Sequence, residues 1–484
     1  MASRVTRLLL WIAIVYPAAC TKPTAPPGGD RGGVVSRPAP PVAEFDLRVS
    51  AREDFFAHVN NRYFAAHPIP ADQTSWGVDF EITERNQTYL KAICDELTAD
   101  TVVSGVGQQI RDLYATAMDE GKLRRDGMEP LKPTLKAIDG VTTAGSAGPV
   151  LARLHASGAW SVFGMYVTAD QKDATKYAVY ISQGATALPE RDYYLADDED
   201  SKRIRTAYAG HLGRMFALCG EAPADAAKSA AAVLAFETEL AKVEWPPAKL
   251  QDPEPQYNKM TRAELVKHAP GIPWDAYFGA VGRPDVAHVI VQQPDYLKRA
   301  AEVFAGATEF DRRAYLRWTA IHHAAPKLHD ALVNETFDFF QKTLNGAPQI
   351  RPRWKRAIDA IDDLMGEGLG RLYVERHFPP AAKERVGRMV DDIVSAFGER
   401  IRTRDWMTPA TRETALTKLA AVRRKLGYPD KWRDYSKLTV ARDSFLANAD
   451  RASKFEFDRR LARLDQPVDL AEWETSPPTV NAYY

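Results

Sequence analysis

Cysteine is scarce in this chain of 484 residues, which holds only Cys20, Cys94 and Cys219. Three cysteines are too few for a disulfide framework, and their spacing is not that of metal ligands. Cys94 and Cys219 lie in the body of the sequence. They either pair with each other or remain two buried thiols, and the sequence leaves both alternatives open.

Excess charge is also absent, because 64 Lys and Arg balance 64 Asp and Glu. A nucleic-acid-binding protein needs a surplus of positive charge to neutralise phosphates, so we expect no nucleic acid as a partner. Long apolar runs are missing as well. The apolar run at residues 8–19 is too short for a membrane-spanning helix, which takes about 20 residues.

The signatures of several enzyme classes are missing. The sequence contains no G-x-S-x-G nucleophile elbow and no Gly-rich phosphate loop. A thermolysin-type zinc site needs two histidines four residues apart with Glu between them, and no two histidines here have that spacing. His322 and His323 are adjacent, so they would point about 100° apart on a helix. We therefore expect no metal site at residues 322–329.

The first residues are typical of a targeting segment. Arg4 and Arg7 precede the apolar run, and the segment closes on "PAAC" at Cys20. This ending resembles the cleavage and lipidation box of bacterial lipoproteins, although Pro17 replaces the usual Leu. We expect a signal peptide at 1–19, export, and a lipid anchor at Cys20 in a bacterial membrane. The alternative is cleavage nearby by an ordinary signal peptidase, with no role for Cys20.

Residues 20–43 are predicted to be a linker after the lipidated cysteine. Residues 21–43 carry six prolines and four glycines without helical or strand periodicity, which is the composition of a spacer. The remaining residues, 44–484, show no repeat or low-complexity run and are predicted to form the folded domain.

This body is predicted to be mainly α-helical, because most of its segments repeat apolar residues every 3.6 positions. A helix is expected to start at Thr408 and to end at Gly427, and its apolar stripe comprises Leu416, Leu419, Val422 and Leu426. Similar helices are predicted at residues 107–121, 201–220, 330–346, 353–378 and 382–403. Strand-like runs at residues 160–170, 177–184 and 288–294 predict a small sheet or hairpins.

Several stretches, taken together and in order, resemble one family. They include "DFFAHVNNRYFAAHPIPADQTSWG", "QGATALPERDYYL", "RWKRAIDAIDDLMGEGLGRLYVERHFP", "DWMTPATRETALTKL" and "PPTVNAYY". From about Glu44 to Tyr484 the chain resembles the neprilysin and endothelin-converting-enzyme group of zinc metallopeptidases, including its bacterial oligopeptidases. It departs from the family at Asn61, Arg62 and Tyr63. It also departs at Ser75, where animal members have an Arg that helps to hold the substrate's C-terminal side.

The resemblance implies a helical lobe that covers the active-site chamber and admits short peptides. It also implies that "VNAYY" is a strand at the rim of that chamber, where Asn481 and Ala482 hydrogen-bond the peptide backbone. An edge strand and a side-chain amide do offer the donors and acceptors for this. The alternative is that Asn481 merely ends a loop.

The family's catalytic residues are not found in the sequence, which has neither the H-E-x-x-H helix nor the E-x-x-x-D that follows it in the family. We therefore expect the N-terminal, substrate-gating portion of an exported zinc endopeptidase, ending at the first strand of the catalytic domain. Alone, it should hold no zinc or other cofactor and cleave no peptide. The rival hypotheses are a non-catalytic lipoprotein that binds peptides or proteins, and a degenerating gene. The sequence does not indicate the substrate or the oligomeric state.

Overall fold

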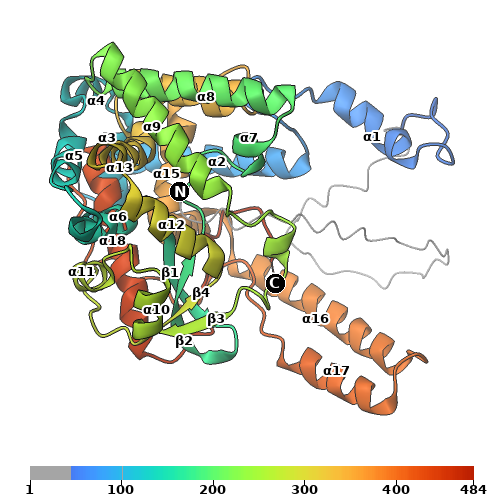
Figure 1. The fold of residues 1–484 in the computed structure, drawn as a ribbon. Helices are drawn as coiled ribbons and strands as arrows, with labels where there is room; N and C mark the ends of the chain where they lie inside the picture. The colour runs from blue at the N-terminus through green and yellow to red at the C-terminus, as the bar shows by residue number, and fades with distance from the viewer. Residues whose placement is uncertain (1–44, 101, 484) are drawn as a thin grey trace, which may run out of the picture. The chain divides into compact units, whose positions relative to one another are not determined.

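The computed structural model describes residues 45–100 and 102–483. These residues form two compact units, residues 45–76 and residues 77–483 (Figure 1). The predicted signal peptide at 1–19, the predicted linker at 20–43 and the predicted lipidation site Cys20 lie outside the described residues.

The smaller unit contains one helix, α1 (Phe55–Ala66), which begins where the Asp54 side chain accepts a hydrogen bond from the Ala57 amide at 2.8 Å. Asp46 anchors the preceding turn, because its carboxylate accepts from the Arg48 guanidinium at 2.8 Å and from Asn61 Nδ2 at 3.3 Å. Asn61, at a position that departs from the family pattern, thus has a structural partner.

The larger unit is mostly helical, with many of the boundaries that the sequence predicts. Its helices are α2 (Val78–Ala99), α3 (Gly105–Met118), α4 (Glu120–Asp126), α5 (Lys132–Asp139), α6 (Gly148–Ser157), α7 (Asp192–Leu195), α8 (Glu199–Leu218), α9 (Pro223–Ala241), α10 (Arg262–His268), α11 (Trp274–Ala280), α12 (Pro294–Gly306), α13 (Glu309–Ala324), α14 (Asp330–Phe337), α15 (Arg353–His377), α16 (Pro380–Arg402), α17 (Pro409–Ala421) and α18 (Phe445–Leu461). The mainly helical fold expected from the sequence is confirmed.

One four-stranded sheet accompanies the helices. It contains β1 (Gly164–Asp170), β2 (Asp173–Ser182), β3 (Asn258–Thr261) and β4 (His288–Val291), in the order β1-β2-β4-β3. β1 and β2 form an antiparallel hairpin, β2 runs parallel to β4, and β3 pairs with β4 antiparallel. All three strand-like runs of the sequence therefore lie in this sheet, joined by the short strand β3.

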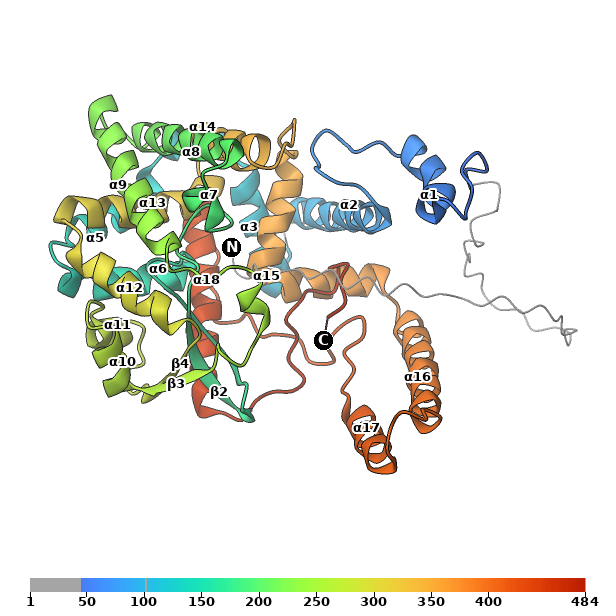
Figure 2. The same ribbon diagram turned by 45° about the vertical axis from the view of Figure 1, so that its right-hand side comes forward.

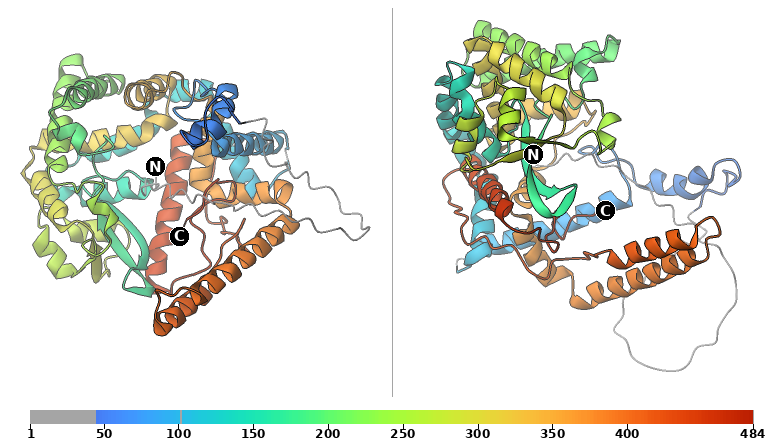
Figure 3. Two further views of the ribbon diagram at one scale, coloured as in Figure 1. Left: turned by 90° about the vertical axis from the view of Figure 1, so that its right-hand side faces the viewer. Right: turned by 60° about the horizontal axis from the view of Figure 1, so that its bottom comes forward.

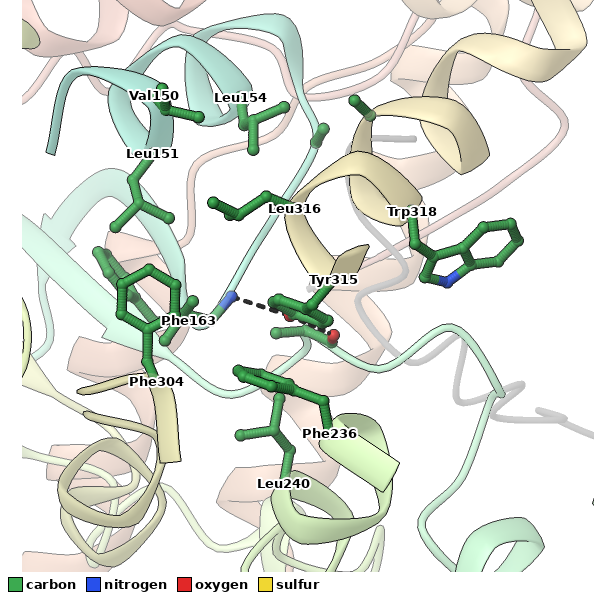
Figure 4. Packing of buried hydrophobic residues seen from close by; sticks show 14 of the residues in the cluster. Val150, Leu151, Leu154, Phe163, Phe236, Leu240, Phe304, Tyr315, Leu316 and Trp318 are labelled. Carbon is green, nitrogen blue, oxygen red and sulfur yellow. Dashed lines mark hydrogen bonds between the residues drawn. The ribbon is translucent and has the colours of Figure 1, made fainter. Parts of the chain in front are cut away.

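The larger of two hydrophobic cores surrounds Tyr315 of α13 (Figure 4). The Phe236 ring stacks on Tyr315 with ring centroids 4.1 Å apart. The Tyr315 hydroxyl accepts from the Val162 amide at 3.0 Å and donates to the Ala185 carbonyl at 2.8 Å. Val162 has a φ of 64°, which is strained for a β-branched residue. The tyrosine thus ties this strained turn to the centre of the core.

A second core lies between α2, α3 and α15, together with residues around Tyr435. Helix α18 belongs to both cores, because Leu446 and Leu461 are buried in the first while Phe445 and Ala452 are buried in the second. Figure 2 shows α18 running between the sheet and α15. One helix therefore joins the two cores within this unit.

The structure corrects two sequence predictions. The helix expected to reach Gly427 ends at Ala421, and Val422 is exposed. Its partner α16 packs on Leu416 and Leu419, the N-terminal part of the predicted stripe, and this packing does not continue to Val422. The segment "VNAYY" was expected to be a strand, but Val480 to Tyr483 form no strand. A strand is defined by pairing, and no neighbouring strand pairs with this segment in the described residues.

Candidate functional site

The segment that leads to the predicted site residues Asn481 and Ala482 packs on α15, whose middle is unusual. Met365 has non-helical backbone angles (φ −139°, ψ 34°) and kinks the helix. Gly366, Gly368 and Gly370 follow, and each lets another segment approach the helix closely. A Cβ on Gly366 would lie 3.0 Å from the Cβ of Ser476, and one on Gly368 would lie 2.9 Å from the side chain of Val106. Glycine is costly inside a helix, so these positions indicate close packing.

Ser476 and Pro477 pack on Gly366 and Gly370, which lie four residues apart on one face of α15. Ser476 Oγ donates to Asp362 Oδ2 at 2.9 Å, one turn before the kink. Asn86 of α2 donates from Nδ2 to the Pro478 carbonyl at 2.9 Å. The Asn86 Oδ1 atom in turn accepts from the Tyr373 hydroxyl at 3.2 Å. Side chains of α2 and α15 therefore hold the segment that leads to Asn481.

We call the surface of α2 and α15 that contacts residues 476–478 the seat of the C-terminal segment. Of the side chains in this seat, Asp362 has the pKa that is shifted most. Burial, with a smaller contribution from the nearby Asp363 and Asp359, raises its pKa to about 7, although the hydrogen bond from Ser476 lowers it. Its Oδ1 atom is buried and has no hydrogen-bond partner in the described residues. The carboxyl group therefore changes protonation near neutral pH, at the contact that holds Ser476.

Asn481 and Ala482 follow the seat and are exposed. The Asn481 amide donates to the Thr479 carbonyl at 3.1 Å, and the Ala482 amide donates to Asn481 Oδ1 at 2.8 Å. The side-chain acceptor and the main-chain donor that the family pattern assigns to peptide binding are thus bonded to each other here. A peptide would have to replace that local bond, whereas Asn481 Nδ2 and the Ala482 carbonyl are available to it.

The residues of a zinc site do not come together in this part of the chain. Zinc is held by three or four His, Cys, Asp or Glu side chains around one point. No group of three such side chains lies close enough to hold a metal within residues 45–100 and 102–483. His322 and His323 lie in the last turn of α13, and His329 precedes α14. The chain's own residues here do not fit the zinc ion of the resembled family.

Sequence reasoning missed two groups of residues. Asn86 carries no signal in the sequence for this contact, yet its side chain donates a hydrogen bond to the Pro478 carbonyl. A further group is Lys327, whose Nζ donates to the His323 carbonyl at 3.0 Å; burial lowers the pKa of Lys327 to about 8, while Asp450 and Asp363 raise it. The glycines of "MGEGLG" inside a helical pattern were the one local signal for the first group.

The described part of the chain contains no helix long and apolar enough to cross a membrane. Cys94 and Cys219 are both free thiols, Cys94 buried and Cys219 half-buried, so they do not pair with each other in the structure. A hollow of about 620 Å³ lies between α3, α15 and residues 432–440, and neither Asn481 nor Ala482 lines it.

Comparison with known proteins places these features in one family. Residues 51–429 match the sequence model of Peptidase family M13. Endothelin-converting enzyme 1 of Bos taurus is 26% identical over 464 residues, which cover 92% of this chain and 61% of that protein. Neprilysin-3 of Drosophila melanogaster is 25% identical over 471 residues, covering 92% and 60%. The chain therefore spans less than two thirds of the length of these relatives.

Solved structures agree. Zinc metalloprotease 1 of Mycobacterium tuberculosis, in complex with an inhibitor, superimposes with a TM-score of 0.86 at 39% identity, covering 92% of this chain and 67% of that one. PepO of Lactobacillus rhamnosis superimposes with a TM-score of 0.79 at 23% identity, covering 90% and 69%, and shows the likeness of fold. The family model and the 39% identical structure both cover most of the chain, which thus belongs to peptidase family M13, the zinc-dependent metallopeptidases related to neprilysin and endothelin-converting enzyme.

Proposed function

We propose that this chain forms the helical, substrate-gating part of an exported zinc endopeptidase that acts on short peptides, and that Asn481 and Ala482 bind the peptide backbone. The match to M. tuberculosis zinc metalloprotease 1, at 39% identity over 92% of this chain, carries the proposal. The exposed Asn481 and Ala482, held at a defined place by α2 and α15, support it further.

Hydrolysis requires residues that this sequence does not contain. In zinc peptidases the metal polarises the scissile carbonyl and activates water, and a glutamate accepts the proton. The sequence has no H-E-x-x-H, and the described residues do not gather a zinc ligand set. The role of this chain is therefore to enclose the peptide and to align its backbone, while another polypeptide segment supplies the metal chemistry.

A fused chain tests this function. In it, the full 484-residue chain is followed by the part of M. tuberculosis zinc metalloprotease 1 that has no counterpart here. We expect zinc-dependent cleavage of a quenched fluorescent short peptide by the fused chain and none by the 484-residue chain. Asn481→Ala should raise KM about tenfold through the loss of a hydrogen bond. Tyr483→Phe, which keeps all backbone groups, should leave KM unchanged.

Three results bear against the proposal. Cleavage by the 484-residue chain alone would contradict the division of labour, and an unchanged KM for Asn481→Ala would remove that residue from the peptide site. A folded fused chain that binds the peptide without cleaving it would favour the second candidate, a non-catalytic peptide-binding lipoprotein. The exposed hydrogen-bonding groups of Asn481 and Ala482 favour that candidate as much as they favour the enzyme.

The proposed location is the outer face of a bacterial membrane or the periplasm, with a lipid anchor at Cys20. Arg4, Arg7 and the apolar run before Cys20 support this proposal. Produced in a bacterial host, the chain should incorporate a labelled fatty acid and sediment with membranes. Cys20→Ser should lose the label and become soluble. Label on the Cys20→Ser variant would place the acylation elsewhere.

A further inference from the structure

Helix α16 exposes an apolar face that nothing covers in the described part of the chain. Met389, Ile393 and Phe397 are 56%, 58% and 54% exposed. They stand four residues apart and therefore lie within one stripe of the helix. Single exposed apolar residues are ordinary on protein surfaces, whereas three large ones in a stripe of one amphipathic helix indicate a surface that packs against something.

The surroundings of α16 explain why the stripe is open. α16 and α17 form a hairpin that stands apart from the other helices in each view (Figure 3). Within the described residues, α17 is the one element with which α16 makes an extensive contact. Leu416 and Leu419 of α17 pack toward Gly398, which lies about 100° around the helix from Phe397. The partner helix therefore covers a neighbouring face and leaves the stripe open.

The base of the hairpin is fixed, so the stripe has a defined direction. Lys383 Nζ donates to the Tyr428 carbonyl and pairs with Asp430, both at 2.8 Å. Gly427 packs so closely on Phe378 that a Cβ there would lie 2.8 Å from the ring. The loop joining the two helices adds Trp406, which is 73% exposed. These contacts fix the base of the hairpin, and its exposed apolar side chains lie beyond that base.

The comparisons indicate what covers this side. In the M. tuberculosis structure, the matched part is 67% of the chain, so a third of that protein has no counterpart here. We call the unmatched third of that protein the missing third. If the missing third packs on the part that the two proteins share, the contact surface on the shared part should be apolar, and it should be exposed when the missing third is absent. The α16 stripe has both properties.

We propose that the stripe of Met389, Ile393 and Phe397 is the docking surface for that missing third, the polypeptide that carries the zinc ligands. The inference rests on the proposed function, because that function requires such a polypeptide. It adds the place of contact: α16 is the arm that holds the zinc-binding polypeptide against the gating lobe.

Oxidation of Met389 by dilute hydrogen peroxide, followed by mass spectrometry, tests the docking separately from catalysis. Met165 and Met215 are 3% and 0% exposed and report on folding within the same sample. In the 484-residue chain Met389 should oxidise rapidly, whereas in the fused chain it should oxidise at least tenfold more slowly. Ile393→Glu in the fused chain should restore rapid oxidation. Ser395→Glu, on the opposite face of α16, should not.

The outcomes separate this inference from the proposed function. A fused chain that protects Met389 but cleaves no peptide would support the docking surface and contradict the function. A fused chain that cleaves peptide while Met389 stays rapidly oxidised would overturn the docking surface. Protection that grows with the concentration of the 484-residue chain alone would overturn it too, because the occupant would then be a second copy.

A misfolded fused chain would show itself by rapid oxidation of Met165 and Met215. The missing third is then supplied as a separate polypeptide to the 484-residue chain. Protection of Met389 that saturates with its concentration, and that Ile393→Glu abolishes, supports the inference. Failure of this protection at saturating concentration overturns it.

Discussion

Gly370 and Pro477 are in such close contact that a Cβ built on Gly370 would lie 2.4 Å from the Cδ atom of Pro477. A side chain at position 370 would force Pro477 away from α15. The two residues are more than a hundred positions apart in the sequence, so their contact is a tertiary constraint on the segment that leads to Asn481.

Gly370→Ala is predicted to destabilise the protein by about 1–3 kcal/mol, the usual cost of overpacking. It should also raise the rate of hydrogen exchange at residues 479–483, because the segment would leave its seat. Denaturant unfolding and exchange mass spectrometry measure the two effects. Gly213→Ala in α8 is the matched control, since a Cβ there meets nothing within 4 Å. Equal losses in both variants would contradict the close contact.

Tyr315→Phe is predicted to lower the free energy of unfolding by about 2–4 kcal/mol. The buried Tyr315 hydroxyl bonds both the Val162 amide and the Ala185 carbonyl, and its removal leaves two buried polar groups without partners. Urea unfolding followed by circular dichroism measures the loss. Tyr483→Phe, at a side chain that is 53% exposed, should change stability by less than about 0.5 kcal/mol. A loss that small for Tyr315→Phe would contradict the structural role.

The ionisation of Glu237 should lower the stability of the protein as pH rises. Burial raises the pKa of this carboxyl from 4.5 to about 7, while hydrogen bonds from Tyr208 and Tyr194 lower it. The folded protein therefore keeps a proton on Glu237 that the unfolded chain has lost. The resulting stabilisation is complete below pH 4.5 and is lost between about pH 4.5 and 7, by up to about 3 kcal/mol.

Glu237→Gln removes this titration and nearly keeps the side-chain shape. The unfolding free energy at pH 8 minus that at pH 5 should therefore be more positive in the variant than in the wild type. Burial raises the pKa of Asp362 and Asp450 but lowers that of His155 and His323, so the two proteins share further slopes of both signs. Identical slopes would show that Glu237 is ionised in the folded state at both pH values.

Cys94 and Cys219 are predicted to be unreactive thiols. Burial raises the pKa of each to about 12, and the thiolate is the reactive form. In a Cys20→Ser variant, a thiol reagent should modify neither cysteine in the native protein at pH 8 and both in denaturant. Absence of two reactive thiols after denaturation without reductant would indicate the disulfide instead.

The sequence predicted a helix correctly where an N-capping residue is followed by apolar residues at helical spacing. Thr408 does accept from the Thr411 amide at the start of α17, and the strand-like runs lie in the sheet. The predicted end of this helix was wrong. The apolar period of the sequence continues to Leu426, whereas the helix ends at Ala421 and Val422 is exposed. Strand β3 was missed because four residues, three of them polar, give little periodicity.

The seat of the C-terminal segment was beyond sequence reasoning for a different reason. The contacts of Ser476 with Asp362 and of Pro478 with Asn86 join residues 114 and 392 positions apart, and no local pattern encodes them. The roles of Asn481, Ala482 and Cys20 remain predictions, since nothing in the fold tests them. The structure adds the contacts of the preceding residues: Asn86 of α2 and Asp362 of α15 bind Pro478 and Ser476.

The parallel pairing of β2 with β4 has a consequence for how fast this protein forms. Tyr180 pairs with Ile290, and the chain between them includes α7 to α11 and strand β3. Closing so long a loop has an entropic cost before any contact compensates it, and folding slows as paired residues lie further apart. We expect α8 and α9 to form early and the sheet to close late. The pairing of β4 with strand β2 of the β1–β2 hairpin is therefore expected to be the slow step in refolding.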